Sequence, residues 1–458
     1  MNPAISDLSS PAARFASNES TPVPLRFGVD MTLSGHAVVD RLSRALPGLA
    51  ADLLEIAASI HAIDRLVPRP TERQRPSGTV WTRSLWADIP VREPNRWRQQ
   101  AALLTQLLHW LTDDDWSVEF SQLQSGAGVL DTPQQFLFDT VPDGTVPVLF
   151  SGGLDSAAGL ALELLHGDAV GISVHTNGLM RGVQRRVLAT LNEASHHQCV
   201  PLQYRVSVHN STETSQRSRG LLFLAAGVAT AWAVHQDHLR VFENGIGAVN
   251  LPYLRSQQGA QATKSVHPLT LRMVQDLASA VSNRPFVIDA PAIALTKAEL
   301  LRRTPSTARK ALGLTVSCDV GFAARVPEHR ACGACTSCLL RLQSLSAAGL
   351  TDLLPMDIHE RRGHDREFNL NAMIWQVTRM RACLDSPEPW QRMVSEFPEL
   401  IDVTGLTQQE VVRLYRAYVE EWSSNEDVVR SHGRARRESR TVALCLMRPE
   451  ARPDNPHR

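Results

Sequence analysis

The chain has 458 residues, 43% apolar and 21% charged, a composition typical of a globular protein that excludes wholesale disorder and fibrous repeats. Lys plus Arg and Asp plus Glu each total 47, so no strong overall field draws the chain to nucleic acid or anionic lipid. The longest nearly uncharged apolar stretch, residues 221–234, is too short to span a bilayer, and the first residues lack a secretory pattern. We therefore expect a cytoplasmic protein that neither spans a membrane nor binds nucleic acid.

The first third of the chain divides into two parts by composition. Residues 1–24 are rich in Ser, Pro, Ala and Asn without periodicity, which predicts a disordered leader. Residues 25–144 contain two helical patterns, Asp52–Val67 and Trp97–Leu111, beside short strand-like segments. We interpret residues 25–144 as an N-terminal α+β domain that docks a partner.

Residues 145–345 alternate apolar, β-branched runs with helical segments. This alternation predicts a parallel α/β sheet that binds ligands at the carboxyl ends of its strands. Residues 346–433 predict a helical C-terminal region, and residues 434–458 a basic tail. The expected strands are 146–150, 169–175, 202–208, 239–244 and 285–291, and the expected helices begin at Ser156, Arg181, Ser218, Thr270 and Thr296.

The sharpest motif lies between an apolar strand and an apolar helix. Its glycines let the backbone turn tightly, so that amide groups and the helix N-terminus converge on a phosphate. Two serine hydroxyls add donors, and the aspartate is suited to hold Mg²⁺. A tight turn with a capping Ser or Asp is the structural alternative. The motif is Ser151-Gly152-Gly153-Leu154-Asp155-Ser156.

Four cysteines fall within 21 residues, which indicates a metal cluster better than disulfides. Four thiolates can close a tetrahedral shell around Zn²⁺, and such a filled site is structural. A [4Fe-4S] cluster is the rival interpretation. The expected ligands are Cys318, Cys332, Cys335 and Cys338.

The Ser151–Ser156 motif resembles the signature of the PP-loop ATP pyrophosphatases at every position. The resemblance implies cleavage of ATP between its α and β phosphates, so that the products include AMP and an adenylate is the intermediate. No Walker A pattern occurs, so the sequence does not favour a P-loop kinase or motor as the alternative function.

Together with Thr296-Lys297-Ala298-Glu299, Ser317-Cys318 and the cysteine cluster, the motif resembles QueC, the 7-cyano-7-deazaguanine synthase family, over about residues 145–345. In that family ATP adenylates 7-carboxy-7-deazaguanine, ammonia forms the amide, and a second ATP yields the nitrile. The resemblance implies that the 151–156 motif binds ATP phosphates with Mg²⁺ and that the cysteines hold zinc. Lys297 and Arg219 resemble cationic residues that stabilise the negative charge developing on the phosphates. The alternative is that either residue is an ordinary basic residue of the surface.

Two stretches depart from the QueC pattern, residues 175–178 and residues 243–252 with 263–268. In the family these regions shape the base pocket and serve the second chemical step. We therefore carry over adenylation, and leave recognition of the deazapurine and nitrile formation open.

The N-terminal region, the C-terminal helices and the Glu243-Asn244-Gly245 segment resemble the QueC-like proteins of bacterial antiphage systems. The chain length and the helix of residues 52–67 favour a likeness to QatC of the Qat system, and the QueC-like component of type IV CBASS is the second choice. This resemblance implies that an amino group of a partner protein replaces ammonia, which makes the protein a carbon–nitrogen ligase.

Two further residues are candidates for the site. His175 follows the second expected strand of the sheet and is a candidate general base for an incoming amine, with a structural histidine as the alternative. Asn244 ends another strand and is a candidate to hydrogen-bond a base or ribose, with a turn role as the alternative.

Three other functions stay open at this point. They are an ammonia-dependent 7-cyano-7-deazaguanine synthase, a tRNA-modifying PP-loop enzyme, for which the neutral net charge is unfavourable, and a non-catalytic scaffold of a defence complex. The oligomeric state also stays open and includes a homodimer.

Overall fold

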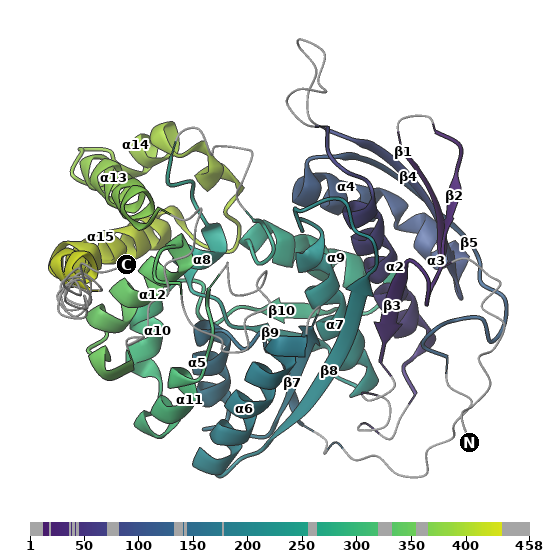
Figure 1. Ribbon diagram of the computed structural model, residues 1–458, viewed down its shortest axis with the longest axis horizontal. Helices are drawn as coiled ribbons and strands as arrows, with labels where there is room; N and C mark the ends of the chain where they lie inside the picture. The colour runs from purple at the N-terminus through teal and green to yellow at the C-terminus, as the bar shows by residue number, and fades with distance from the viewer. Residues whose placement is uncertain are drawn as a thin grey trace, which may run out of the picture.

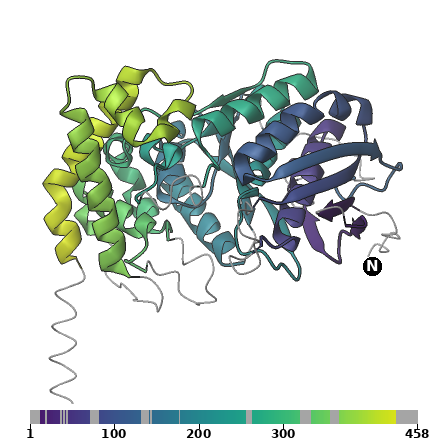
Figure 2. The ribbon, with the colours of Figure 1, turned by 90° about the horizontal axis from the view of Figure 1, so that it is seen from above.

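The computed structural model contains two β-sheets with helices around them (Figure 1). The N-terminal elements and the C-terminal helices lie at opposite ends, with the larger sheet between them (Figure 2). The structure describes residues 12–17, 20–35, 38, 42, 45–70, 82–131, 141, 144–175, 178–254, 263–318, 332–353 and 365–432.

The N-terminal region forms a four-stranded sheet in the order β2-β1-β4-β5. Strands β4 and β5 are parallel, and β1 is antiparallel to both of its neighbours. Alternate residues of β4 and β5 are buried, as expected of strands with one face on a core. The elements are β1 (Ala13–Ser17), β2 (Val23–Leu25), α2 (Gly48–Leu66), β4 (Ser84–Val91), α3 (Pro94–Gln99), α4 (Ala101–Thr112) and β5 (Asp115–Gln122).

The structure differs from the predicted leader of residues 1–24, because β1 and β2 lie within it. Ala13 and Leu25 are fully buried. A strand of five residues is stabilised here by pairing with β4, about 70 residues further along the chain. Local composition does not reveal that pairing. Residues 1–11 lie outside the described part.

The central sheet has the order β10-β9-β6-β7-β8-β3. Five of its strands are parallel, which confirms the predicted parallel α/β sheet, and β3 joins β8 as an antiparallel edge that the sequence did not predict. The strands are β3 (Met31–Ser34), β6 (Val146–Leu149), β7 (Ala169–His175), β8 (Cys199–Val208), β9 (His238–Val241) and β10 (Val287–Asp289).

Helices cover both faces of the central sheet. On one face lie α2, α7 and α9, and on the other lie α5 and α6 with α10 and α11 beyond them. The short helix α8 follows β9 at the carboxyl edge of the sheet. The bounds are α5 (Leu154–Glu163), α6 (Gly178–Ala194), α7 (Arg219–Ala233), α8 (Gly245–Val249), α9 (Pro268–Ser282), α10 (Lys297–Arg303), η3 (Ser306–Ala308) and α11 (Arg309–Gly313).

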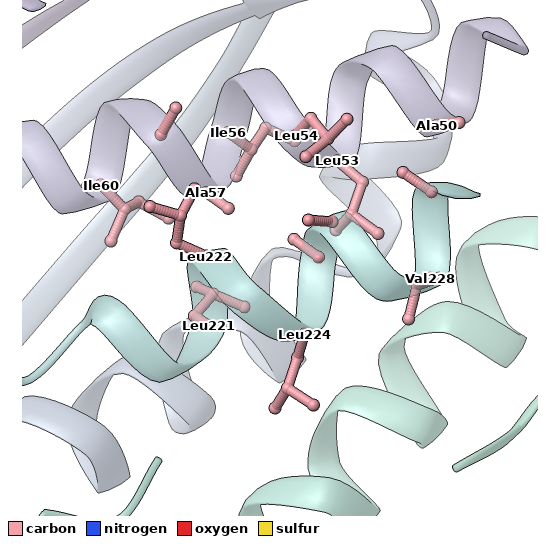
Figure 3. Close-up of a cluster of buried hydrophobic side chains, with 14 of the residues drawn as sticks. Ala50, Leu53, Leu54, Ile56, Ala57, Ile60, Leu221, Leu222, Leu224 and Val228 are labelled. Atoms are coloured by element: carbon pink, nitrogen blue, oxygen red, sulfur yellow. The ribbon is translucent and has the colours of Figure 1, made fainter. Parts of the chain in front are cut away.

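Helix α7, the apolar stretch noted in the sequence, is buried between the central sheet and α2. Figure 3 shows Leu53, Ile56 and Ile60 of α2 facing Leu221 and Leu222 of α7. The N-terminal region and the central sheet therefore share one hydrophobic core. No helix in the described ranges combines the length and apolar character that crossing a membrane requires.

The C-terminal region is helical, as predicted, and has a separate core that contains Tyr415, Tyr418 and Trp422. Its helix α15 packs against α12 and α13. The predicted tail of residues 434–458 lies outside the described residues. The elements are α12 (Thr336–Ala347), η4 (Thr351–Leu353), α13 (Arg366–Leu384), α14 (Pro389–Glu396), η5 (Pro398–Asp402) and α15 (Gln408–Ser431).

Close packing of α5 on the residue that follows β9 gives a first prediction. A Cβ atom at Gly159 would lie 1.8 Å from Cγ of Phe242. We expect Gly159→Ala to lower the free energy of unfolding by about 1–3 kcal/mol, because the ring must move despite the better helix propensity of alanine. Urea unfolding measures the change.

The matched control is Gly167→Ala, where an added Cβ meets no atom within 4 Å. Equal stability of the two variants would contradict close packing at Gly159.

Candidate active site

The predicted phosphate loop joins β6 to α5, in the expected strand–turn–helix arrangement. Gly152 has φ 85°, a conformation that favours glycine, and its carbonyl accepts a hydrogen bond of 3.2 Å from Val316 N. Gly153 is the N-cap of α5, and Leu154 is its first residue. The amides of the first helical turn, with the positive end of the helix dipole, are suited to bind phosphate.

Two serine hydroxyls lie side by side in the loop. Ser151 Oγ and Ser156 Oγ are 3.1 Å apart, and Ser156 Oγ donates to the carbonyl of Gly153 at 3.1 Å. Both serines line a pocket of about 640 Å³, within the roughly 300–1,000 Å³ typical of ligand sites. The loop therefore presents hydroxyl groups at the edge of a space large enough for a nucleotide.

Asp155 is buried against a cation from a distant segment. A capping box between Thr296 and Glu299 fixes the start of α10, whose first residue is Lys297. The Lys297 ammonium donates a short hydrogen bond to Asp155 Oδ2, and Asn244 Nδ2 donates to the same oxygen at 3.0 Å. Burial alone would raise the pKa of Asp155, but the Lys297 charge and these hydrogen bonds hold it below its ordinary value.

Glu243 lies beside Asp155 and also lines the pocket. Burial, followed by the negative charge of Asp155, raises the pKa of Glu243 well above its ordinary value. The Glu243 carboxyl group accepts a hydrogen bond of 3.0 Å from Asn244 Nδ2 and, in its protonated form, donates to Asp155. Two adjacent acids with opposite pKa shifts are typical of a functional site.

The residues present fit a divalent cation at Asp155. Its Oδ1 atom is buried and meets no amide, hydroxyl or ammonium donor among the described residues. A carboxylate oxygen held in this way beside a phosphate-binding loop is a hard ligand of the kind that Mg²⁺ prefers. Glu243 is a second carboxyl group, in hydrogen-bond contact with Asp155.

Asn244 does not line the pocket, which differs from the expected hydrogen bond to a base or ribose. Its Oδ1 accepts a hydrogen bond of 3.0 Å from Gly247 N as the N-cap of α8, while its Nδ2 bonds Asp155 and Glu243. Because both ends of the amide are used inside the protein, Asn244 holds the two acids in place.

His175 and Arg219 line the same pocket as the loop. His175 ends β7, as predicted, and burial, then the charges of Arg181 and Arg205, lower its pKa. Its Nδ1 atom is buried and has no hydrogen-bond partner among the residues that the structure describes. The imidazole is thus neutral at pH 7, which a general base requires. Arg219 begins α7, with its guanidinium 5.3 Å from the centre of the Phe223 ring.

The four predicted metal ligands come together, with their sulfur atoms within 4.8 Å of one another. Around a zinc ion with Zn–S bonds of about 2.3 Å, sulfurs lie about 3.8 Å apart. The Sγ atoms of Cys332 and Cys338 are 3.9 Å apart. This spacing fits a single tetrahedral ion, whereas a four-iron cube needs room between the thiolates. Zinc bound there would fix the ends of the segment between Cys318 and Cys332.

Arg341 connects the cysteine cluster to the phosphate loop. Its Nη1 donates to Thr315 Oγ1 at 2.8 Å and to Ser317 Oγ at 3.3 Å, and Ser317 Oγ accepts from Leu154 N at 3.4 Å. Burial lowers the pKa of Arg341 to about 10, although the charges of Cys338 and Asp155 favour the cation. A buried guanidinium thus offsets negative charge at both sites.

The sequence did not single out several pocket residues. Glu243 carried a signal, since it follows an apolar strand at the same sheet edge as the phosphate loop. Gln184, Phe223 and Tyr253 gave none, because only the fold places them along the pocket.

The raised pKa of Glu243 predicts that Glu243→Gln becomes more stable, relative to the parent protein, as the pH rises above about 4.5. In the unfolded chain Glu243 ionises in this range, whereas in the folded protein it keeps its proton, so the parent loses stability that glutamine does not lose. Urea unfolding at about pH 5 and pH 8 in Mg²⁺-free buffer measures the difference.

Glu193→Gln, at an exposed position, is the matched control for this experiment. Its stability difference from the parent is expected to stay constant over that range, because the Glu193 side chain is exposed to water in the folded as in the unfolded chain. A difference for Glu243→Gln that does not grow with pH would contradict the assignment.

The cysteine cluster predicts that the purified protein holds about one zinc ion per chain and that Cys335→Ser loses it. Cys383→Ser, which changes a buried thiol outside the cluster, is expected to retain the metal. Elemental analysis of the purified variants measures zinc and iron together. Iron with inorganic sulfide, or zinc retained by Cys335→Ser, would contradict the prediction.

Comparisons with known proteins place this site in a family context. Residues 264–349 match the family model described as "Queuosine biosynthesis protein QueC". A 7-cyano-7-deazaguanine synthase of Geotalea daltonii is 40% identical over 81 residues, which cover 17% of this chain and 31% of that protein.

Longer alignments reach almost the full length of other relatives. The 7-cyano-7-deazaguanine synthase of Kineococcus radiotolerans is 29% identical over 46% of this chain and 98% of its own length. That of Methylobacillus flagellatus is 29% identical over 45% of this chain and 93% of its own. The chain is therefore QueC-like and similar to enzymes, and the part matched by the family model contains the cysteine cluster.

Proposed function

We propose that the protein uses ATP to activate a carboxylic acid of the 7-deazaguanine type and transfers the acyl group to an amine. In the first step a carboxylate oxygen attacks the α-phosphorus of ATP, the bond to the β-phosphate oxygen breaks, and pyrophosphate leaves. In the second step the amine nitrogen attacks the carbonyl carbon, AMP leaves, and the amine loses a proton. The product is an amide.

The observation that carries the proposal is the contact between Lys297 and Asp155 at the phosphate loop. The loop amides and the α5 N-terminus are suited to hold the phosphates, and Lys297 is placed to stabilise the charge that develops on pyrophosphate. A Mg²⁺ ion on Asp155 would neutralise the same charge. A scaffold has no need of these buried charged groups.

The other side of the pocket is suited to the acid and the amine. Arg219, expected from the sequence to clamp phosphate charge, is proposed here to offer a cation for the carboxylate instead, and Phe223 offers a ring for a planar base. His175 is the candidate to accept the proton that the attacking amine loses. The roles of these three residues are part of the proposal.

Two acceptors are compatible with this chemistry. The name of the relatives, 7-cyano-7-deazaguanine synthase, is that of enzymes with a nitrile product, and in the QueC family ammonia is the acceptor. The likeness to antiphage QueC-like proteins favours an amino group of a partner protein, in a cytoplasmic defence complex. We propose the protein acceptor, because 54% of the chain lies outside the 46% aligned with the Kineococcus enzyme and offers surface for a partner.

The proposal predicts that incubation with ATP, Mg²⁺, 7-carboxy-7-deazaguanine and an amine, either a candidate partner protein or ammonia, yields AMP, which chromatography of the nucleotides detects. Lys297→Met is expected to lower the rate of AMP formation by roughly 10²–10³-fold, because it removes one preorganised charge from the site.

Asp237→Asn, at an exposed position, is the matched control and should keep the parent rate. ADP in place of AMP, or AMP formation unchanged in Lys297→Met, would contradict adenylation at this site. If ammonia supports AMP formation at the same rate as a partner protein does, the synthase alternative is favoured.

A further inference from the structure

Two chain segments form one wall of the pocket outside the phosphate loop. Arg219, Gly220 and Phe223 come from the start of α7, and Ser265 comes from the segment before α9. A Cβ atom on Gly220 would lie 2.5 Å from Cα of Ser265, so the two backbones touch directly. The shape of this wall depends on how the two segments are held against each other.

A single residue of the N-terminal region bonds both segments. Asp113 follows α4 with φ 56°, a left-handed conformation. Its Oδ1 accepts a hydrogen bond of 3.0 Å from Lys264 Nζ, and its Oδ2 accepts one from Arg217 Nη1. Lys264 precedes Ser265, and Arg217 lies two residues before Arg219. Asp113 therefore joins the two halves of the wall through two charged hydrogen bonds.

The surroundings keep Lys264 in place. Its ammonium also donates to the carbonyl of Trp110 at 2.9 Å and lies 4.2 Å from the centre of the Trp110 ring. Trp110 Nε1 donates to Thr270 Oγ1 at 2.8 Å. The end of α4 thus acts as a fixed support on which the segment before α9 rests.

A second, buried anchor fixes the start of α7. Ser218, the N-cap residue, donates from Oγ to Asp64 Oδ2 at 2.7 Å and lies 3.2 Å from His61 Nδ1. Both partners belong to α2. The phosphate loop is held differently, through Val316, Gln184 and Lys297.

We propose that Asp113 is a positioning residue that joins Arg217 to Lys264 and thereby sets the affinity of the pocket for the acid, but not for ATP. The inference rests on the proposed function for the identity of the acid. It assigns to the N-terminal region a role in shaping the substrate pocket of the QueC-like part.

The test is Asp113→Asn, because asparagine has the same shape, adopts the left-handed conformation readily and removes only the charge. We expect the KM for 7-carboxy-7-deazaguanine to rise about five- to tenfold with kcat within about twofold, the pattern of lost substrate binding. The dissociation constant of ATP, measured by calorimetry, should stay within about twofold.

Asp115→Asn, at an exposed position two residues away, is the matched control and should behave as the parent protein. Lys264→Gln should reproduce the rise in KM, and the double variant with Asp113→Asn should show less than the sum of the two effects. An Asp113→Asn protein identical to Asp115→Asn, or one with ATP affinity weakened in parallel, would overturn the inference.

Hydrogen exchange provides a measurement that needs no activity. In Asp113→Asn the amides of residues 217–224 and 263–270 should exchange faster, whereas those of 151–160 should not change. Exchange that is faster throughout the described chain, or exchange rates unchanged from those of the parent protein, would also overturn the inference. If the parent protein forms no AMP, the proposed function fails, and the exchange result still decides whether Asp113 holds the wall.

Discussion

The site depends on a carboxylate that is kept ionised inside the protein. Removing the charge of Asp155 from water is costly, and three groups from two parts of the chain offset that cost: the Lys297 ammonium, the Asn244 amide and the protonated Glu243. Since Glu243 and Asn244 follow β9 and Lys297 begins α10, the carboxyl edge of the central sheet must assemble before the carboxylate is stable. Folding and the preparation of the site are thus one process.

The buried arginine extends this dependence to the cysteine cluster. Arg341 contacts Ser317, which in turn contacts the amide of Leu154 at the start of α5. Four thiolates around one divalent ion carry a net negative charge, and the guanidinium lies where it offsets that charge. A metal bound by the cluster would therefore support the phosphate loop through the contacts of Arg341 and Ser317.

Features with a local signal were predictable from the sequence. The five parallel strands, the helices between them and the loop of Ser151 to Ser156 follow from apolar periodicity and turn chemistry within short windows. Strands β1 and β3 were not predictable, because each exists through pairing with a distant strand. The link from Asp113 to Lys264 joins residues about 150 positions apart, and charged residues at a helix end give no hint of such a partner.

The shared core of α2 and α7 limits how the chain can be divided. The aligned part matches nearly the whole length of the Kineococcus enzyme, which suggests that residues before about 144 could be cut away. Cutting there would uncover the apolar stripe of α7 in Figure 3 and remove β3 from the edge of β8. The shortened protein would then expose an apolar surface and an unpaired sheet edge. Both features promote association between copies, so we expect the shortened protein to aggregate.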